Sequence, residues 1–423
     1  MTSPTAEELA RRAALAERTA RGDEAEELWN ALLAAFPAHP KALFIQGRRR
    51  VEQGDPAGGL SLLTQAEAGD QADPEIPLYL ALAHRMLGAN EAALAAIERA
   101  LAIDPYFFLA QLSKGALLER VGKPRLAART YRNAIKIAPS PEHLPAAQRG
   151  ALEHAKRVVA DNARALGAHL RQRTEATRRL FPNESLERFD ECLDILAGVK
   201  QRFVQDPLLL CFPRLAPIPF HDRALFPWLG EVEAATEMLR EELFTVLRED
   251  RAKFAPYIQF PPGAPVNQWA ELNYSPAWTS FFLWRDGVRQ NENCARCPGA
   301  SALLDRLPLA HQRGYGPSAM FSVLSPRTRI PPHTGSANTR LIAHLPLILP
   351  PSCGFRVGND SRDWRMGEAW VFDDTIEHEA WNDSEETRVI LIFDVWNPLL
   401  TQAERELVCE MMEALNTYNT EGG

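Results

Sequence analysis

The sequence predicts an α + β protein in which an all-α helical-repeat solenoid is followed by a β-sandwich or barrel. Two patterns support this fold class. Glycine recurs at intervals of 34 early in the chain, at Gly54, Gly88 and Gly122. After residue 318, short apolar runs rich in Val, Ile, Phe and Trp are separated by turn clusters, which is typical of antiparallel β structure. A chain of 423 residues is expected to form two or three domains.

Composition and charge limit the classes of partner. The chain is 46% apolar and 24% charged, as in ordinary globular proteins. A formal net charge of −8, without a long basic run, argues against a nucleic-acid partner. The start, Met1–Glu8, is polar and acidic, and no run of about 18 apolar residues occurs anywhere. We therefore expect no membrane span and a cytoplasmic location.

Cysteine usage gives little indication of function. Six cysteines in so long a chain do not indicate a secreted disulfide framework. Cys294 and Cys297 form a C-x-x-C pair, but a structural zinc site needs four ligands and no second pair is present. We interpret this pair as structural.

Residues 1–140 are predicted to form stacked pairs of helices. Each unit reads as a helix, a turn that contains glycine, and a second helix that ends near proline, as at Pro105 and Pro139. The pattern resembles the tetratricopeptide repeat family, whose helix pairs stack into a solenoid with a concave surface. That resemblance implies recognition of a peptide or protein partner. The alternative is that the repeats only dimerise or brace the rest of the chain. Residues 141–205 are predicted to be a helical connector, broken at Phe181–Asn183.

Residues 206–423 are predicted to form the β domain. A helix is expected over Trp228–Arg251, and an amphipathic helix over Thr401–Leu415 is expected to end the domain. The predicted strands are Met320–Leu324, Arg340–Ile348, Gly354–Val357, Ala369–Phe372 and Arg388–Trp396.

One predicted strand has a polar face and an apolar face. With a side-chain period of two, Asn338, Arg340, Ile342 and His344 share one face, while Leu341, Ala343 and Leu345 share the other. A row that holds both Arg and His is costly to bury unless an anion or a metal ion meets it. The polar row is therefore predicted to be a pocket wall.

Two further histidines are candidate metal ligands. His333 follows a Pro-Pro pair at one end of a strand, and His378 is interpreted as the end of another apolar strand. They lie 45 positions apart, and two strands of one small barrel could carry them. Neutral imidazole suits Fe, Zn, Cu or Ni. Taken singly, each is more often a satisfied surface or core residue, but the clustering of histidine and arginine here favours a site.

The motifs in this region resemble the aspartyl/asparaginyl β-hydroxylase family of iron and 2-oxoglutarate-dependent oxygenases. They are H-T-G-x-x-N-x-R-L-x-x-H-L from His333, F-D-D-x-x-x-H-E-x-W-x-D from Phe372, an arginine at Arg388, and D-V-W-x-P from Asp394. The resemblance covers residues 270–400 in outline. It implies a double-stranded β-helix of the jelly-roll or cupin type, with Fe(II), 2-oxoglutarate and O2 as cofactor and co-substrates. It also implies that the helix over Trp228–Arg251 packs on the outer sheet of this domain.

The resemblance also implies roles for particular residues. His333 and His378 would bind Fe(II). Arg388 with Ser322 would hold the distal carboxylate of 2-oxoglutarate, and His344 would approach the carboxylate near the metal. These roles agree with the chemistry, because a free carboxylate is best met by a planar bidentate guanidinium. Arg340 and Trp284 are assigned to substrate binding.

Two positions depart from common patterns. Gly335 stands two residues after the first histidine, where many such enzymes have a carboxylate ligand. The resembling family shares this absence, and so do halogenating members of the wider superfamily. Asp373, Asp374, Glu377 and Glu379 could in principle supply a third ligand, but Glu377 and Glu379 are expected to point away and to have structural roles.

The second departure is Ile342, which stands where members acting on epidermal-growth-factor-like domains carry a second arginine. One guanidinium, that of Arg340, would then meet a substrate carboxylate. The alternative for Arg340 is a structural salt bridge.

The leading functional prediction is β-hydroxylation of an aspartyl, asparaginyl or related residue, with a peptide or protein substrate favoured by the repeats. Halogenation or desaturation on the same fold is one alternative. A non-catalytic adaptor with a relic barrel is another, although a scaffold has no need of the four residues His333, His378, Ser322 and Arg388 together.

Overall fold

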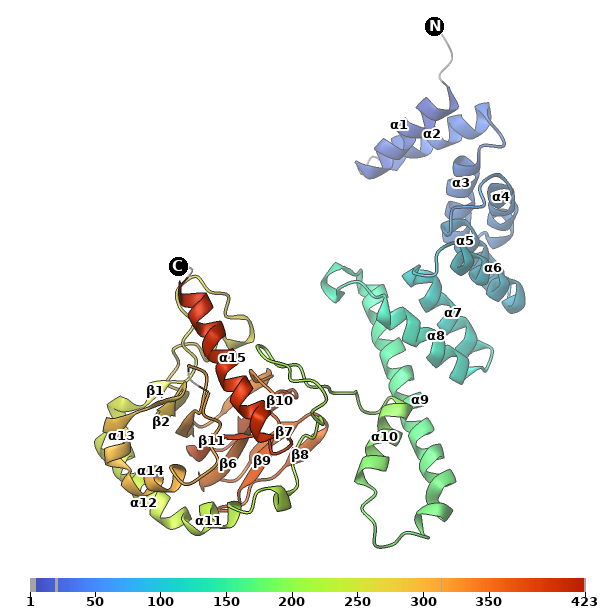
Figure 1. Cartoon of the computed structure of the whole chain (residues 1–423). Helices are drawn as coiled ribbons and strands as arrows, with labels where there is room; N and C mark the ends of the chain where they lie inside the picture. The colour runs from blue at the N-terminus through green and yellow to red at the C-terminus, as the bar shows by residue number, and fades with distance from the viewer. Residues whose placement is uncertain (1–4, 20–21, 313, 422–423) are drawn as a thin grey trace. The chain divides into compact units, whose positions relative to one another are not determined.

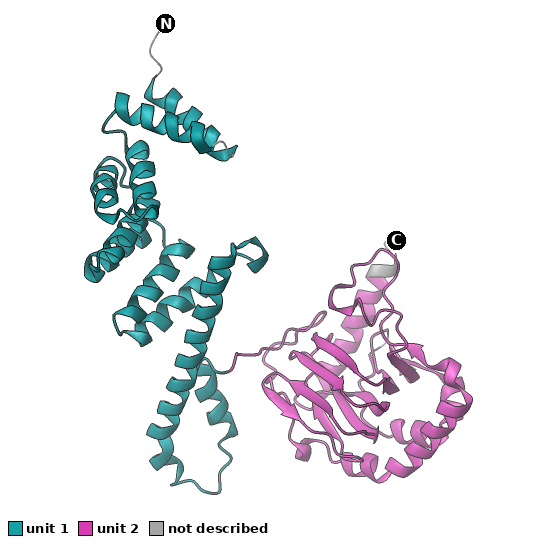
Figure 2. Ribbon diagram, turned by 180° about the vertical axis from the view of Figure 1, so that it is seen from behind, with its two compact units in different colours: residues 1–199 teal, residues 200–423 magenta. Residues whose placement is uncertain are grey.

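Helix pairs make up the first part of the chain and antiparallel β-sheets the second (Figure 1). The computed structural model describes residues 5–19, 22–312 and 314–421. It separates unit 1, residues 1–199, from unit 2, residues 200–423 (Figure 2). Among the helices of the described ranges, none combines the length and the apolar composition that a bilayer crossing requires.

Consecutive helices of unit 1 pack as pairs, in agreement with the predicted tetratricopeptide repeats. The pairs are α1 (Ala6–Arg18) with α2 (Gly22–Ala35), α3 (Pro40–Glu52) with α4 (Pro56–Gly69), α5 (Glu75–Met86) with α6 (Asn90–Ile103), and α7 (Phe108–Arg120) with α8 (Pro124–Lys136).

The turns within three of these pairs explain the repeated glycine. Gly54, Gly88 and Gly122 have φ of 88°, 77° and 72°, a left-handed conformation that costs glycine little. Small side chains on the second helices, such as Ala93 and Ala127, are fully buried, which lets neighbouring helices approach closely. The 34-residue spacing thus reflects one left-handed glycine turn and one close helix–helix contact in each pair.

Two helices follow the pairs. The long α9 (Ala146–Arg178) packs against α8, and α10 (Glu187–Ala197) packs back on α9. The predicted break at Phe181–Asn183 lies between them. Both belong to unit 1, and unit 2 begins at Lys200 rather than at the predicted residue 206. The difference arises because Gln205 already bonds to residues of the β domain.

Unit 2 contains two antiparallel sheets. The larger has the order β1-β2-β4-β11-β6-β9, with β3 paired to β2, and the smaller has the order β5-β10-β7-β8. The strands are β1 (Ala255–Pro256), β2 (Trp278–Arg285), β3 (Val288–Arg289), β4 (Ala319–Leu324), β5 (Thr328–His333), β6 (Arg340–Ile348), β7 (Cys353–Val357), β8 (Asp360–Arg362), β9 (Trp370–Phe372), β10 (His378–Asn382) and β11 (Arg388–Trp396).

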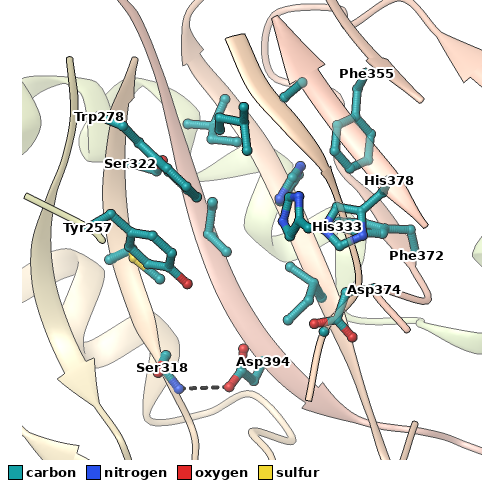
Figure 3. Close-up of a pocket in the computed structure, with 18 of the residues that line it drawn as sticks. Tyr257, Trp278, Ser318, Ser322, His333, Phe355, Phe372, Asp374, His378 and Asp394 are labelled. Atoms are coloured by element: carbon teal, nitrogen blue, oxygen red, sulfur yellow. Dashed lines mark hydrogen bonds between the residues drawn. The ribbon is translucent and has the colours of Figure 1, made fainter. Parts of the chain in front are cut away.

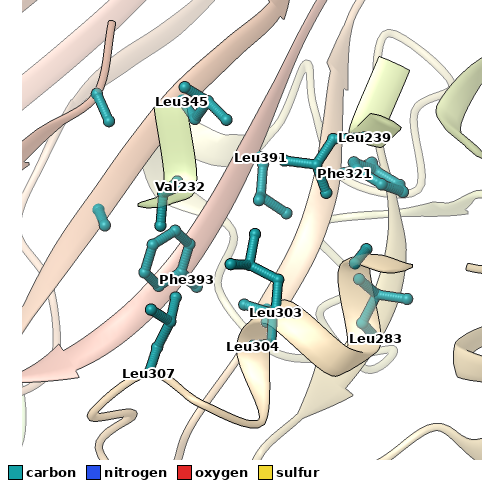
Figure 4. Close-up of a cluster of buried hydrophobic side chains, with 14 of the residues drawn as sticks. Val232, Leu239, Leu283, Leu303, Leu304, Leu307, Phe321, Leu345, Leu391 and Phe393 are labelled. Carbon is teal, nitrogen blue, oxygen red and sulfur yellow. The ribbon is translucent and has the colours of Figure 1, made fainter. Parts of the chain in front are cut away.

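Helices cover one face of the larger sheet. α11 (Leu229–Ala234), α12 (Thr236–Glu249) and α14 (Pro298–Leu304) pack their apolar side chains against β2, β4, β6 and β11 (Figure 4). The single helix predicted over Trp228–Arg251 is broken at Ala235, but it packs on the outer sheet as predicted. The remaining helices of unit 2 are α13 (Asn291–Arg296) and α15 (Gln402–Glu421).

The alternation of side chains predicted for the strand Arg340–Ile348, which is β6, is confirmed. Leu341, Ala343 and Leu345 of β6 point into the helix-covered core. Arg340, Ile342 and His344 line a cavity on the opposite face of the strand. Asn338 lies before β6 begins, so the alternation does not reach it. The larger sheet therefore has an apolar outer face and a partly polar inner face.

Candidate active site

A cavity of about 360 Å³ lies between the two sheets of unit 2 (Figure 3). Its walls come from β2, β4, β6, β9 and β11 of the larger sheet and from β5, β7 and β10 of the smaller one. This volume is sufficient for a small ligand. Of the residues assigned from sequence, it brings together His333, His378, Arg388, Ser322, His344 and Arg340.

The two candidate metal ligands face one another. His333 ends β5, His378 begins β10, and the antiparallel register places them directly opposite. Their ring centroids lie 4.0 Å apart. The sequence interpretation of His378 as the end of a strand was wrong, because the preceding apolar strand, β9, ends at Phe372. Strand pairing, rather than spacing in the sequence, brings the two rings together.

Each ring is held through its Nδ1 atom. Nδ1 of His333 lies 2.7 Å from the Pro331 carbonyl oxygen, and Nδ1 of His378 lies 3.1 Å from the Ile376 carbonyl oxygen. An Nδ1–H that donates to a carbonyl leaves Nε2 with a free lone pair. Burial lowers the pKa of His333, and burial together with His333 lowers that of His378 well below its usual value. Both imidazoles are therefore neutral near pH 7, which is the form that binds a metal ion.

No acidic side chain among the described residues is arranged with these histidines as a third metal ligand. Within the described ranges, no group of three or more His, Cys, Asp or Glu side chains is arranged to hold a metal ion. Glu377 and Glu379 both form ion pairs with Arg356, in agreement with the structural roles expected for them. Asp374 lines the cavity, and a Cβ atom at Gly335 would lie 1.9 Å from its Oδ2. The Asp374 carboxylate thus fills the space beside Gly335, and burial raises its pKa to about 7.

We expect Gly335→Ala to lower the free energy of unfolding by about 1–3 kcal/mol, because the added methyl group overlaps the Asp374 carboxylate. Replacing Asp374 with Ala in the same chain removes the obstacle and should recover most of the loss. Urea unfolding measures both effects. Gly230→Ala is the matched control, because a Cβ there would meet nothing within 4 Å. An unchanged unfolding curve for Gly335→Ala would show that the carboxylate does not occupy this space.

Arg388 is a buried cation without an anionic partner among the described residues. It begins β11 and is 1% exposed, and its Nε and Nη1 atoms have no hydrogen-bond partner in the described part of the chain. Its guanidinium carbon lies 4.9 Å from the centroid of the Trp364 ring. Burial lowers the pKa of Arg388 to about 10. A buried charge is costly when unpaired, so this end of the cavity is suited to an anion.

Ser322 and His344 lie on the strands that flank β11. The Ser322 hydroxyl accepts a hydrogen bond of 3.0 Å from Trp278 Nε1, which fixes its position. Buried His344 has an Nδ1 without a partner among the described residues, and burial with nearby Arg388 lowers its pKa well below the usual value. Three polar groups, from β4, β6 and β11, thus face one end of the cavity with unused hydrogen-bonding capacity.

Arg340 lines the cavity but is already paired. Its guanidinium forms an ion pair with Asp394, the residue two positions before the end of β11. Asp394 also accepts a 2.9 Å hydrogen bond from the Ser318 backbone N–H (Figure 3). The structure therefore gives Arg340 the salt bridge that was the alternative to a substrate carboxylate.

Trp284 is not among the residues that line this cavity, and its assignment to substrate binding stays a prediction. The ladder between β2 and β4 shifts register between Phe282 and Trp284. This irregularity turns Trp284 away from the inner face, and the ring packs against the helix-covered core and His311. Sequence alternation could not reveal the shift.

Aromatic residues before β2 also line the cavity, and the sequence reading missed them. Trp269 packs edge-on against His333 at a centroid distance of 4.9 Å, and Tyr257 lies 4.2 Å from the Trp278 ring. Both lie in segments rich in proline, for which the sequence gives no periodic pattern. Only their aromatic character could have suggested a role.

Comparisons with known proteins identify a family for the region that contains most of this site. Residues 233–398 match the model of the family described as aspartyl/asparaginyl beta-hydroxylase. An ornithine lipid ester-linked acyl 2-hydroxylase of Rhizobium tropici is 33% identical over 202 residues, which cover 47% of this chain and 67% of that protein. The human aspartyl/asparaginyl beta-hydroxylase is 32% identical over 177 residues, or 41% of this chain.

The matched region spans only part of the length of several relatives. The match covers 22% of the human enzyme and 54% of a Xenopus tropicalis aspartate beta-hydroxylase domain-containing protein 2, which is 31% identical. Among solved structures, one of MamA aligns with a TM-score of 0.28 at 21% identity, over 35% of this chain and 90% of that one.

Proposed function

This chain belongs to the aspartyl/asparaginyl β-hydroxylase family, and on that premise we propose an Fe(II)- and 2-oxoglutarate-dependent dioxygenase. Its substrate would be an aspartyl, asparaginyl or related residue, hydroxylated at the β-carbon. The observation that carries the proposal is the joint presence, in one cavity, of two opposed neutral imidazoles and a buried arginine without an anion.

The residues present fit the cofactor and the co-substrate. His333 and His378 would bind Fe(II) through their free Nε2 atoms, since both Nδ1 atoms are engaged. Fe(II) with a chelated 2-oxo acid supplies the oxidising power for a C–H bond when O2 reacts, with succinate and CO2 as by-products. Arg388 and Ser322 would hold the far carboxylate, and His344 would donate to the near one. Apolar walls would keep bulk water from the reacting atoms.

A second candidate substrate class follows from the pairing of Arg340. Its charge is balanced by Asp394, and Ile342, Ile392 and Met320 line the same part of the cavity. An uncharged acyl chain would contact this surface without breaking the ion pair between Arg340 and Asp394. Hydroxylation of an acyl chain, the activity in the name of the Rhizobium tropici relative, is therefore the alternative.

The repeats of unit 1 are proposed to bind a peptide or protein. Tyr79, Leu82, Leu109 and Leu112 line a second cavity of about 430 Å³ formed by these helices. Apolar side chains with a few polar neighbours are typical of sites for extended peptides. The double-stranded β-helix topology and the cytoplasmic location stay predictions.

The proposed reaction is tested by following succinate in the presence of Fe(II), 2-oxoglutarate and O2. The probes are a peptide containing aspartate, the same peptide with asparagine, and vesicles of a saturated acyl lipid. A product heavier by one oxygen atom supports hydroxylation. Chlorine in place of hydrogen would indicate the halogenase, and loss of two hydrogens would indicate the desaturase. Failure to bind 2-oxoglutarate would favour the adaptor.

A further inference from the structure

We propose that Gln205 is a positioning residue for the two histidines, and this inference rests on the metal site of the proposed function. Gln205 does not line the cavity, and it belongs to none of the motifs found in the sequence. It would act by holding together the loop that follows His333 and the turn that precedes His378.

The backbone around Gln205 runs beside both loops. Gln205 forms an antiparallel bridge with Ile376, and the Asp206 N–H donates to the Thr375 carbonyl oxygen at 2.8 Å. Three residues after Gln205, the Leu208 N–H donates to the Gly335 carbonyl oxygen at 3.0 Å. The extended segment 205–210 therefore borders the turn that precedes His378 and the loop that follows His333.

The Gln205 side chain joins these two loops directly. Its Nε2 donates to Asp373 Oδ2 at 2.6 Å, and its Oε1 accepts from Asn338 Nδ2 at 3.1 Å. Asp373 lies five positions before His378, and Asn338 lies five positions after His333. The Gln205 amide thus connects the segment that leads from His333 to Asn338 with the segment that leads from Asp373 to His378.

Both partners of Gln205 are fully buried and otherwise fixed. The other oxygen of Asp373 accepts hydrogen bonds from the Thr375 N–H at 3.0 Å and from its hydroxyl at 2.6 Å. The Asn338 amide also donates to the Phe212 carbonyl oxygen at 2.9 Å and accepts from the Phe212 N–H at 2.7 Å. Asp373 is held within its own loop by Thr375, and Asn338 is held by Phe212 of the segment that carries Gln205. The Gln205 amide between them therefore adds a side-chain link between the two loops, beside the hydrogen bond that the Gly335 N–H donates to the Asp374 carbonyl oxygen at 2.6 Å. Loss of the amide would leave Asp373 Oδ2 without this buried donor and would loosen the two loops relative to one another.

The test uses Co(II) as a probe, because its affinity and its visible absorption report ligand geometry without turnover. In the full chain, Gln205→Ala is expected to weaken Co(II) binding by about tenfold or more and to change the absorption spectrum. Gln205→Glu, which has nearly the same shape, should weaken binding at least as much, because a carboxylate cannot donate to Asp373 and repels it. If Gln205 served only in packing, the Gln205→Glu chain would bind Co(II) as the wild type does. Gln201→Ala is the matched control, since that side chain is exposed and lies only four residues before Gln205.

Each outcome decides the proposal. Wild-type affinity and spectrum in both Gln205 variants would overturn it. Should Gln205→Ala fail to fold, Asn338→Asp examines the same bridge from the other loop, since it can still accept from the Phe212 N–H but cannot donate to Gln205. An unchanged affinity in that variant would also overturn the assignment. Absence of Co(II) binding by the wild-type chain would instead refute the proposed metal site, and the positioning role with it.

Discussion

His378→Ala is expected to weaken Fe(II) and Co(II) binding by roughly 100-fold or more, since one of the two proposed protein ligands is lost. Removal of a group that merely supports a metal ligand typically costs about 10–100-fold. Loss of the ligand itself should cost at least as much. The cavity is otherwise expected to persist, because His378 is paired with His333 at the start of β10 and the rest of the strand keeps its ladder. Titration with Co(II), followed by absorption, measures the change.

The control for this variant is His169→Ala, which removes an exposed imidazole of α9 in unit 1. It should bind Co(II) as the wild type does. A His378→Ala chain that retains wild-type affinity would remove His378 from the metal site. Thermal unfolding of both variants distinguishes loss of a ligand from loss of the fold.

Arg388→Lys should weaken 2-oxoglutarate binding by roughly 2 kcal/mol or more, about 30-fold, because a fork of two N–H donors is replaced by a point charge. Burial already lowers the pKa of Arg388 to about 10, and an ammonium in the same place would lose its proton more readily. The loss of affinity should therefore grow as pH rises through the lowered pKa of the lysine. Isothermal titration at two pH values measures both effects.

Arg327→Lys is the matched control, since Arg327 pairs with Glu385 on the surface. Its effect on 2-oxoglutarate affinity should be negligible. Equal dissociation constants for Arg388→Lys and the wild type would exclude Arg388 from the co-substrate site.

Local patterns in the sequence predicted the parts of this structure that depend on neighbouring residues. The left-handed turns at Gly54, Gly88 and Gly122 need glycine, so their period marks the helix pairs directly. The alternation along β6 separated the cavity face from the core face because β6 is regular over Arg340–Leu345.

Features that depend on pairing between distant segments were not predictable in the same way. The ion pair of Arg340 involves Asp394, which is contributed by the neighbouring strand β11. Trp284 faces the core because of a register shift, which leaves no mark in the sequence. Gln205 lies about 130 residues from the nearer loop that it contacts, and no motif surrounds it. The resemblance of the motifs pointed to His333 and His378 as candidate ligands, but only strand pairing shows that the two side chains meet.

The central claim is that one cavity binds a metal ion and 2-oxoglutarate together, and linkage between the two tests it most directly. Mn(II), which replaces Fe(II) without turnover, should tighten 2-oxoglutarate binding by about tenfold or more, and 2-oxoglutarate should tighten Mn(II) binding by the same factor. Calorimetric titration of each ligand with and without the other measures this coupling. Binding of 2-oxoglutarate with one affinity, whether or not Mn(II) is present, would contradict the account.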